Sequence, residues 1–299
     1  MCQMWGLWAV VWLAARVPRG LAYRVCALAG ELYFWLNPAH SRKAVENFAV
    51  VLADDVGAAR VRLMARRSFR NYVKSLFDFF RQMSIDPDLI ESDAFVDGWE
   101  HLDAGLERGR GILVVTPHFG NWDIAAALTA ARGYPIVVLA DRFTPPGLDL
   151  LVRWGRNRAG VGVVTVDSGA LRRTLQLLRR NVIVGIVADR PQREGGVEVE
   201  FFGASAWLPA GPARFALRTG AAVILGYIGR RPGDRTFFGG FAPQLAFTPS
   251  GDEGADVRAL TQMIAREMEG VLRQYPDQWY MFRQMWPGMG ARTDEHTEG

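Results

Sequence analysis

The sequence contains 299 residues, of which 49% are hydrophobic and 22% are charged, and its formal net charge is +4. This length can bury a substantial core, as one large α/β domain or two modest ones. The modest positive charge favours an anionic surface, but no basic run of the kind found in nucleic-acid-binding tails is present. The two cysteines, Cys2 and Cys26, have no metal-type spacing,. We therefore expect a reduced compartment, no disulfide, no metal site and no nucleic-acid partner.

The opening of the chain is apolar and aromatic. Residues 5–17 form an apolar run that is shorter than the ~20 residues needed to cross a bilayer,. A second aromatic run follows at residues 33–36, and a long helix is predicted over residues 57–83,. We interpret residues 1–90 as an amino-terminal helical region at the membrane interface. The alternative is that ordinary helices pack on the core.

Residues 91–299 are predicted to form an α/β core in one continuous domain. Apolar β-type runs alternate with helical patterns, which indicates a mostly parallel central sheet flanked by helices. Helices are predicted at residues 101–108, 122–132, 148–159, 170–180 and 255–274. Strands are predicted at residues 111–116, 135–140, 162–166, 182–187, 197–202, 222–228 and 236–247.

Residues 116–123, with the sequence Thr-Pro-His-Phe-Gly-Asn-Trp-Asp, join a predicted strand to a predicted helix. Pro117 ends the strand, Gly120 permits a sharp turn, and Asn121 is a good helix N-cap. Asp123 then falls in the first helical turn, where it can hydrogen-bond to His118. A carboxylate on one imidazole nitrogen fixes the tautomer and leaves the other nitrogen free to accept a proton. The alternative is a structural histidine, with Asp123 offsetting the helix dipole.

Charged pairs follow two further predicted strands. Asp141 and Arg142 come after residues 135–140, and Asp189 and Arg190 come after residues 182–187. Ligands of open α/β sheets bind at the carboxyl edge, so we expect these four residues to lie near His118 and bind substrate. Arginines there suit phosphate groups. The alternative is a salt bridge with a neighbouring carboxylate.

Glu198 and Glu200 alternate along a β-forming run, so both side chains point to the same side of the strand,. If that side meets the site, one of them can accept a hydrogen bond from His118 or from a sugar hydroxyl. If it does not, they are the polar outward residues of an exposed edge strand.

The residue 116–123 segment resembles the His-x4-Asp/Glu motif of the glycerolipid acyltransferase superfamily. The similarity is to its bacterial branch, which contains the lipid A late acyltransferases and the phosphatidylinositol mannoside acyltransferases. Asp at position 123, together with the sequence GVEVEFFG at residues 196–203, is more similar to the mannoside branch. Further supporting segments are residues 140–142 (Ala-Asp-Arg), 153–156, 188–190 (Ala-Asp-Arg) and 276–280 (Pro-Asp-Gln-Trp-Tyr).

The resemblance implies a membrane-associated O-acyltransferase at the cytoplasmic face of the cell membrane, bound peripherally or monotopically. It implies an acyl thioester donor, acyl-CoA or acyl-carrier protein, and no bound cofactor. The acceptor is implied to be a hydroxyl of a glycolipid or phospholipid, such as a phosphatidylinositol mannoside. It also implies that Arg156 contributes to substrate binding and that Glu198 or Glu200 is functional, and we choose Glu200 as catalytic. The apolar helices before residue 90 are then expected to supply an acyl-chain tunnel.

The mechanism that we expect is direct transfer without a covalent acyl-enzyme. His118, oriented by Asp123, takes the proton of the acceptor hydroxyl while that oxygen attacks the thioester carbonyl. Backbone N–H groups of residues 119–121 are expected to stabilise the oxyanion. The sequence has no G-x-S-x-G elbow, no P-loop and no complete dinucleotide fingerprint,. Two alternatives remain, a non-catalytic lipid-binding protein and a thioester hydrolase that uses water as the acceptor.

Overall fold

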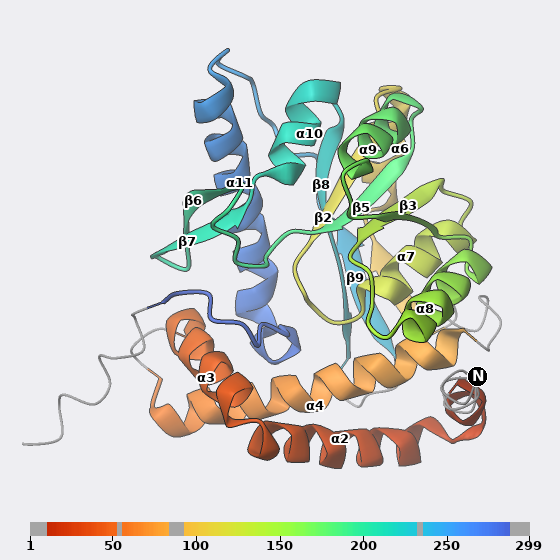
Figure 1. Ribbon diagram of the computed structural model, residues 1–299, viewed down its shortest axis with the longest axis vertical. Coiled ribbons are helices and arrows are strands. Elements are labelled where there is room, and N and C mark those ends of the chain that lie inside the picture. Colours follow the sequence, from red (N-terminus) through yellow and green to blue (C-terminus); the bar gives the residue numbers. More distant parts are fainter. Residues whose placement is uncertain (1–10, 53–55, 84–92, 232–235, 288–299) are drawn as a thin grey trace, which may run out of the picture.

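A seven-stranded sheet lies at the centre of the computed structural model, which describes residues 11–52, 56–83, 93–231 and 236–287 (Figure 1). In sheet order the strands are β1 (Ala94–Asp97), β9 (Phe237–Phe241), β8 (Ala222–Arg230), β2 (Ile112–Thr116), β5 (Ile183–Val187), β3 (Ile136–Ala140) and β4 (Gly162–Thr165). The five strands from β8 to β4 are parallel, whereas β9 is antiparallel to β8 and parallel to β1. The prediction of a mostly parallel sheet is confirmed.

Helices cover both faces of the sheet because successive strand residues point to opposite sides. Ile112 and Val114 of β2 belong to the buried cluster beneath α6 (Trp99–Glu107) and α7 (Trp122–Ala131). Leu113 and Val115 belong to the larger cluster on the other face. That face is covered by α9 (Ala170–Arg179), α10 (Gly211–Thr219) and α11 (Glu253–Gln274), while α8 (Pro146–Arg158) packs beside β4. The flanking helices of the prediction are thus confirmed.

The strand predicted at residues 197–202 lies outside the central sheet. It is β6 (Gly196–Phe201), which pairs antiparallel with β7 (Ala204–Pro209) as a separate hairpin packed on α11. The two residues between the strands, Phe202 and Gly203, have φ angles of 56° and 75°. Positive φ at both central residues is typical of a tight hairpin turn, so the chain reverses before it can reach the sheet.

Three amino-terminal helices lie across the carboxyl edge of the strands, with α2 and α4 side by side in Figure 1. They are α2 (Arg19–Leu36), α3 (Pro38–Leu52) and α4 (Ala58–Gln82). Gly30 permits the close crossing of α2 and α4, since a Cβ atom there would lie 2.5 Å from Cα of Arg70. Phe48 and Phe69 belong to the same buried cluster as the sheet, so these helices pack on the core.

Part of the predicted amino-terminal organisation lies outside the described residues. Residues 11–16 are helical, but the start of the predicted 5–17 run and the predicted boundary at residue 90 are not described. None of the helices in the described ranges combines the length and the apolar character needed to cross a bilayer.

A buried ion pair joins the amino-terminal helices to the sheet. The carboxylate of Asp78 on α4 pairs with the guanidinium of Arg230 at the end of β8 and accepts a 2.7 Å hydrogen bond from the Tyr23 hydroxyl. Both charged side chains are at most 4% exposed. Loss of one partner therefore leaves the other charge uncompensated in a desolvated setting.

We predict that Asp78→Asn lowers the free energy of unfolding by about 3–5 kcal/mol, the usual cost of breaking a buried pair. Chemical denaturation measures this change. Arg218→Gln is the matched control, because Arg218 pairs with Glu253 on the surface, where such pairs contribute about 0–1 kcal/mol,. Equal effects of the two substitutions would contradict the prediction.

Candidate active site

The turn after β2 is shaped by Gly120 and Asn121. The φ angle of Gly120 is 56°, and a Cβ atom at this position would lie 1.8 Å from the carbonyl oxygen of Ile228, so only glycine fits,. Asn121 is the N-cap of α7, as the sequence predicts, and its side-chain oxygen accepts a 3.2 Å hydrogen bond from the Ile124 N–H,. The turn therefore holds His118 at the carboxyl end of the sheet.

His118 is paired with Asp189, which follows the adjacent strand β5. Their side chains lie 2.5 Å apart, from Nδ1 to Oδ1, and the His118 N–H donates to Oδ2 at 2.9 Å. The Trp279 indole donates a third hydrogen bond to Oδ2 at 2.7 Å. The Asp189 side chain is 0% exposed and that of His118 is 20% exposed. The structure thus places Asp189, predicted to bind substrate, with its carboxylate buried and bonded to His118 and Trp279.

The ionisation of Asp189 fixes the state of the imidazole. Burial by itself raises the pKa of this carboxyl, but the charge of protonated His118 and the hydrogen bonds from His118 and Trp279 lower the pKa more,. A carboxylate only accepts hydrogen bonds, so in the neutral form of the imidazole Nδ1 carries the proton and Nε2 has the lone pair. The structure gives Nε2 no hydrogen-bond partner among the described residues. The arrangement is that of a general base with its orienting carboxylate.

Asp123 is bonded to Arg156 of α8 instead of orienting His118. Its Oδ1 accepts a 2.7 Å hydrogen bond from Nε of Arg156, and the two side chains are 12% and 9% exposed. The predicted partnership of Asp123 with the Nδ1 side of His118 is thus corrected to Asp189. Asp123 lies in the first turn of α7, and its side chain extends to α8. Asp189 lies beside the imidazole because it follows β5, which is adjacent to β2 in the sheet. The buried pair ties the first turn of α7 to α8.

The other charged residues of the carboxyl edge are exposed. Asp141 and Arg190 form a salt bridge of 2.8 Å, with side chains 63% and 41% exposed, which is the alternative that the sequence left open. Arg142 is also exposed. The pKa of the Asp149 carboxyl is lowered, most of all by its hydrogen bond from the Phe143 N–H and to a smaller extent by the positive charge of Arg142.

Glu198 and Glu200 lie on the exposed side of the β6–β7 hairpin, as their alternation predicts. The Glu198 carboxylate accepts a hydrogen bond from the Ser205 hydroxyl, and the backbone of Glu200 bonds to the Gln262 side chain of α11. Nothing in the described residues joins either carboxylate to His118. The structure thus does not bring Glu200, predicted as catalytic, or Glu198, predicted as a substrate ligand, into contact with His118, because their strand pairs in a hairpin outside the central sheet.

The backbone N–H groups of residues 119–121 are not available for an oxyanion. They donate to the carbonyl oxygens of Pro117, Gln278 and Ile228 at 2.7, 2.9 and 3.0 Å, respectively. This corrects the expected oxyanion site. The next two N–H groups, those of Trp122 and Asp123, begin α7 and have no acceptor among the described residues, as expected for a helix start.

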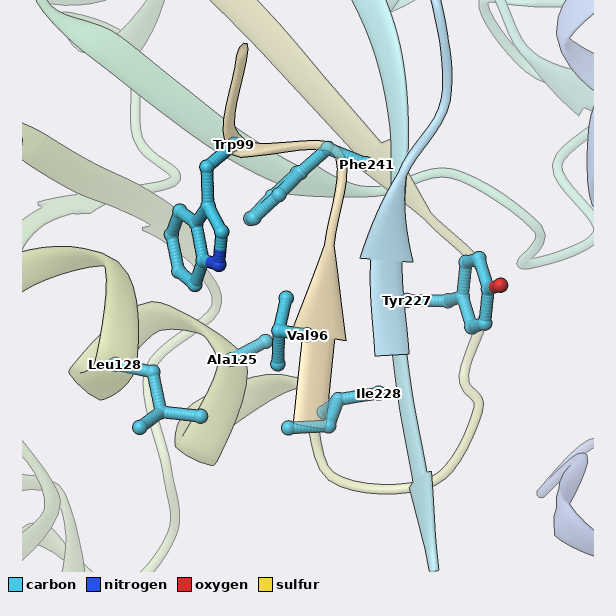
Figure 2. A pocket seen from close by; sticks show the side chains of 7 residues that line it. All are labelled: Val96, Trp99, Ala125, Leu128, Tyr227, Ile228 and Phe241. Atoms are coloured by element: carbon cyan, nitrogen blue, oxygen red, sulfur yellow. The ribbon is translucent and has the colours of Figure 1, made fainter. Parts of the chain in front are cut away.

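A small apolar pocket lies beside α7 (Figure 2). Its lining includes Val96, Trp99, Leu128 and Phe241. Tyr227 also borders it, but the Tyr227 ring points away from these side chains, to the other side of its strand (Figure 2). No residue before position 90 lines it, so it is not the predicted acyl-chain tunnel. Within the described ranges, no group of three or more metal-ligating side chains is placed to hold an ion.

An α/β sheet that carries a histidine–carboxylate pair at its carboxyl edge is a setting for base-catalysed group transfer. The family model for bacterial lipid A biosynthesis acyltransferases matches residues 1–287. The chain therefore belongs to this family and is an acyltransferase of lipid biosynthesis, which confirms the resemblance.

Individual relatives in this family come from mycobacteria. The chain is 31% identical to the phosphatidylinositol mannoside acyltransferase of Mycobacterium tuberculosis (strain ATCC 25618 / H37Rv) over 289 residues, covering 93% of this chain and 87% of that protein. It is 28% identical to the phosphatidylinositol mannoside acyltransferase of Mycolicibacterium smegmatis over 226 residues, covering 75% of this chain and 72% of that protein.

The pH dependence of stability tests the state of Asp189. Its folded-state pKa lies below the unfolded value of about 3.9, so its stabilising contribution is complete above that value and is lost as the pH falls through the folded-state pKa,. We predict that Asp189→Asn is less stable than the parent near pH 7 and that this difference in the free energy of unfolding narrows as the pH falls from 7 to below about 4. Chemical denaturation across this range measures the difference. A difference that does not change with pH would refute the assignment.

Proposed function

We propose that this protein transfers a fatty acyl group from a thioester donor to a hydroxyl group of a glycolipid or phospholipid. The pairing of Nδ1 of His118 with the buried Asp189 carboxylate carries the proposal, because it leaves Nε2 as the base of a side chain that is 20% exposed. The names of the mycobacterial relatives support a phosphatidylinositol mannoside as the acceptor.

The reaction then proceeds by direct attack. Nε2 of His118 takes the proton of the acceptor hydroxyl as its oxygen bonds to the thioester carbonyl carbon. Asp189 stabilises the imidazolium that forms. The tetrahedral intermediate collapses, the carbon–sulfur bond breaks, and the thiolate takes the proton back from Nε2. The products are an ester and a free thiol, and no acyl-enzyme forms.

The start of α7 is the best placed group to stabilise the oxyanion. The N–H groups of Trp122 and Asp123 lack an acceptor among the described residues, and the helix dipole adds positive potential at this end,. The Asp123–Arg156 pair fixes this turn against α8. We propose that Asp123 and Arg156 act by holding the turn, which differs from the direct roles that the sequence suggested.

The donor is an acyl thioester whose carrier bears phosphate. Asp141, Arg142 and Arg190 are exposed at the same sheet edge as His118, and two arginines there suit the phosphates of acyl-CoA,. Acyl-carrier protein also presents a phosphate beside its thioester arm. Parallel assays with both donors decide between them.

Helix α2 presents an apolar face to solvent that fits a membrane surface. Its exposed large apolar side chains follow a spacing of three or four residues, which places them on one side of the helix. They are Leu21, Val25, Leu28, Leu32, Trp35 and Leu36, each between 53% and 74% exposed. The opposite side of α2 is already buried against the core through residues such as Tyr23 and Phe34.

The flanks of this face support a lipid partner. Arg62 of α4 lies over the Trp35 ring at 4.8 Å, and Arg16 lies over the Trp12 ring at 4.0 Å. Tryptophan beside arginine is typical of the headgroup layer of a membrane, where the ring is half buried and the guanidinium meets phosphate. We propose peripheral or monotopic binding at the cytoplasmic face, where acyl thioesters are made.

We predict that His118→Ala lowers the turnover rate by roughly 10²–10⁴-fold, the usual contribution of a general base. The assay is release of free thiol from palmitoyl-CoA, with and without a lipid extract of the source organism, and acyl-carrier-protein donors are run in parallel. His101→Ala on α6 is the control and should keep the parent rate. Thiol release that rises with lipid in the parent and vanishes in His118→Ala supports the proposal.

The same assay distinguishes the alternatives. Thiol release that lipid does not accelerate would identify a thioester hydrolase. A parent protein that binds lipid but turns over neither donor would identify a non-catalytic lipid-binding protein, and either result would overturn the proposed transfer.

The membrane face is tested by the double variant Leu28→Glu/Leu32→Glu. Burial of each leucine contributes about 1.5–3 kcal/mol, so we predict that partitioning onto phosphatidylglycerol-containing vesicles falls by roughly 100-fold or more. Vesicle sedimentation measures the change. Leu171→Glu on α9 is the control, because that side chain is also exposed but lies outside the α2 face. Unchanged sedimentation of the double variant would contradict the membrane assignment.

A further inference from the structure

Trp279 is a fully buried residue whose only polar atom reaches the site. Its side chain is 0% exposed, and Nε1 donates a 2.7 Å hydrogen bond to Oδ2 of Asp189. An indole N–H only donates, and it seeks a partner when buried. Because Trp279 is sealed from solvent, it cannot touch substrate, and the one polar contact of its side chain with the site is the hydrogen bond to Asp189.

The backbone around Trp279 is fixed to both sides of the catalytic turn. The Gly120 N–H donates to the Gln278 carbonyl at 2.9 Å, and the Tyr280 N–H donates to the His118 carbonyl at 2.8 Å. The Ser68 hydroxyl of α4 donates to the carbonyl of Trp279 itself. In Figure 1 the segment after α11 runs back above α3 and α4. The indole is therefore held in register with the His118 turn.

The carboxylate of Asp189 depends on a small number of donors. Oδ1 accepts a hydrogen bond from Nδ1 of His118. Oδ2 accepts hydrogen bonds from the backbone N–H of His118 and from the indole N–H of Trp279. Burial penalises the charged form, so each donor counts toward keeping it ionised,. Without the indole, Oδ2 loses one of its two donors, and the carboxylate is freer to turn away from Nδ1.

We propose that Trp279 is a positioning residue of the acyl transfer, which holds the Asp189 carboxylate ionised and aimed at Nδ1 of His118. The proposal rests on the proposed function, because it assigns Trp279 a part in that reaction. The predicted consequence is a loss in the chemical step without a loss in substrate binding.

The chain offers a matched control in Trp286. This residue is 3% exposed and stacks on Phe201 with ring centroids 5.9 Å apart, and its ring centroid lies 6.4 Å from that of Trp279. Its Nε1 is buried without a hydrogen-bond partner. Trp286→Phe therefore removes the same atoms from the same aromatic cluster as Trp279→Phe, but it breaks no hydrogen bond.

The experiment compares kcat and KM of the parent, Trp279→Phe and Trp286→Phe in the thiol-release assay. We predict that kcat of Trp279→Phe falls roughly tenfold or more, while its KM stays within about twofold of the parent. Trp286→Phe should keep both values near those of the parent. A kcat of Trp279→Phe equal to that of Trp286→Phe would overturn the proposal. A roughly tenfold rise in the KM of Trp279→Phe with an unchanged kcat would overturn it as well.

A double-variant cycle shows whether the effect passes through Asp189. Once Asp189→Asn has removed the carboxylate, adding Trp279→Phe should lower kcat no further. Fully additive losses would mean that Trp279 acts by another route. If Asp189→Asn does not fold, proton–nitrogen NMR of the parent replaces this test: the Trp279 indole N–H, which donates to a carboxylate, should resonate downfield of the Trp286 indole N–H, which has no acceptor,. A Trp279 signal that is not downfield would refute the contact.

Failure of the proposed function has a different signature. A parent protein that turns over neither donor overturns the acyl transfer and, with it, the role of Trp279 in that reaction. A parent that turns over while Trp279→Phe matches Trp286→Phe overturns the positioning role alone.

Discussion

A carboxylate that is sealed from water has to find its stabilisation inside the protein, and the site is built around that requirement at Asp189. The strand order brings His118 beside it, because β5 lies next to β2. The imidazole and one backbone N–H supply two of the donors, and an indole from the far end of the chain supplies the third. The hydrogen bond from Nδ1 of His118 helps to keep the Asp189 carboxylate charged, and it also fixes the tautomer of the neutral imidazole. The same contact therefore stabilises the buried charge and leaves Nε2 able to accept a proton.

One face of α4 connects this arrangement to the rest of the molecule. Its polar side chains recur at spacings of three and four residues, at Ser68, Asn71, Ser75 and Asp78. Ser68 and Asn71 bond the backbone of the segment that carries Trp279, at the carbonyls of Trp279 and Asp277. The Ser75 carbonyl accepts from the cap residue of α7, and Asp78 pairs with the end of β8. The helix that packs against the exposed apolar helix α2 is thus the helix that braces the catalytic turn.

Local signals of the sequence predict local structure well in this protein. The alternation of strands and helices, the N-cap at Asn121 and the sharp turn at Gly120 are all confirmed, because each depends on neighbouring residues. The partner of His118 depends instead on which strand lies next to β2, and no spacing along the chain reveals that. The sequence likewise does not show that the strand of Glu198 and Glu200 pairs in a hairpin separate from the central sheet. Trp279 stood in a recognised segment, but only the fold shows what its indole donates to.

The segment that carries Trp279 follows every strand of the central sheet in the sequence. Asn47 of α3 bonds the carbonyl oxygens of Met281 and Arg283 and the N–H of Met285, joining positions more than 230 residues apart. Contacts of such separation form late, because a long loop has to close before they give any stabilisation. On the ribosome, every strand of the sheet and the turn bearing His118 emerge before this closing segment. The hydrogen bond from Trp279 to the buried Asp189 carboxylate therefore requires a segment that is synthesised after all the strands of the central sheet.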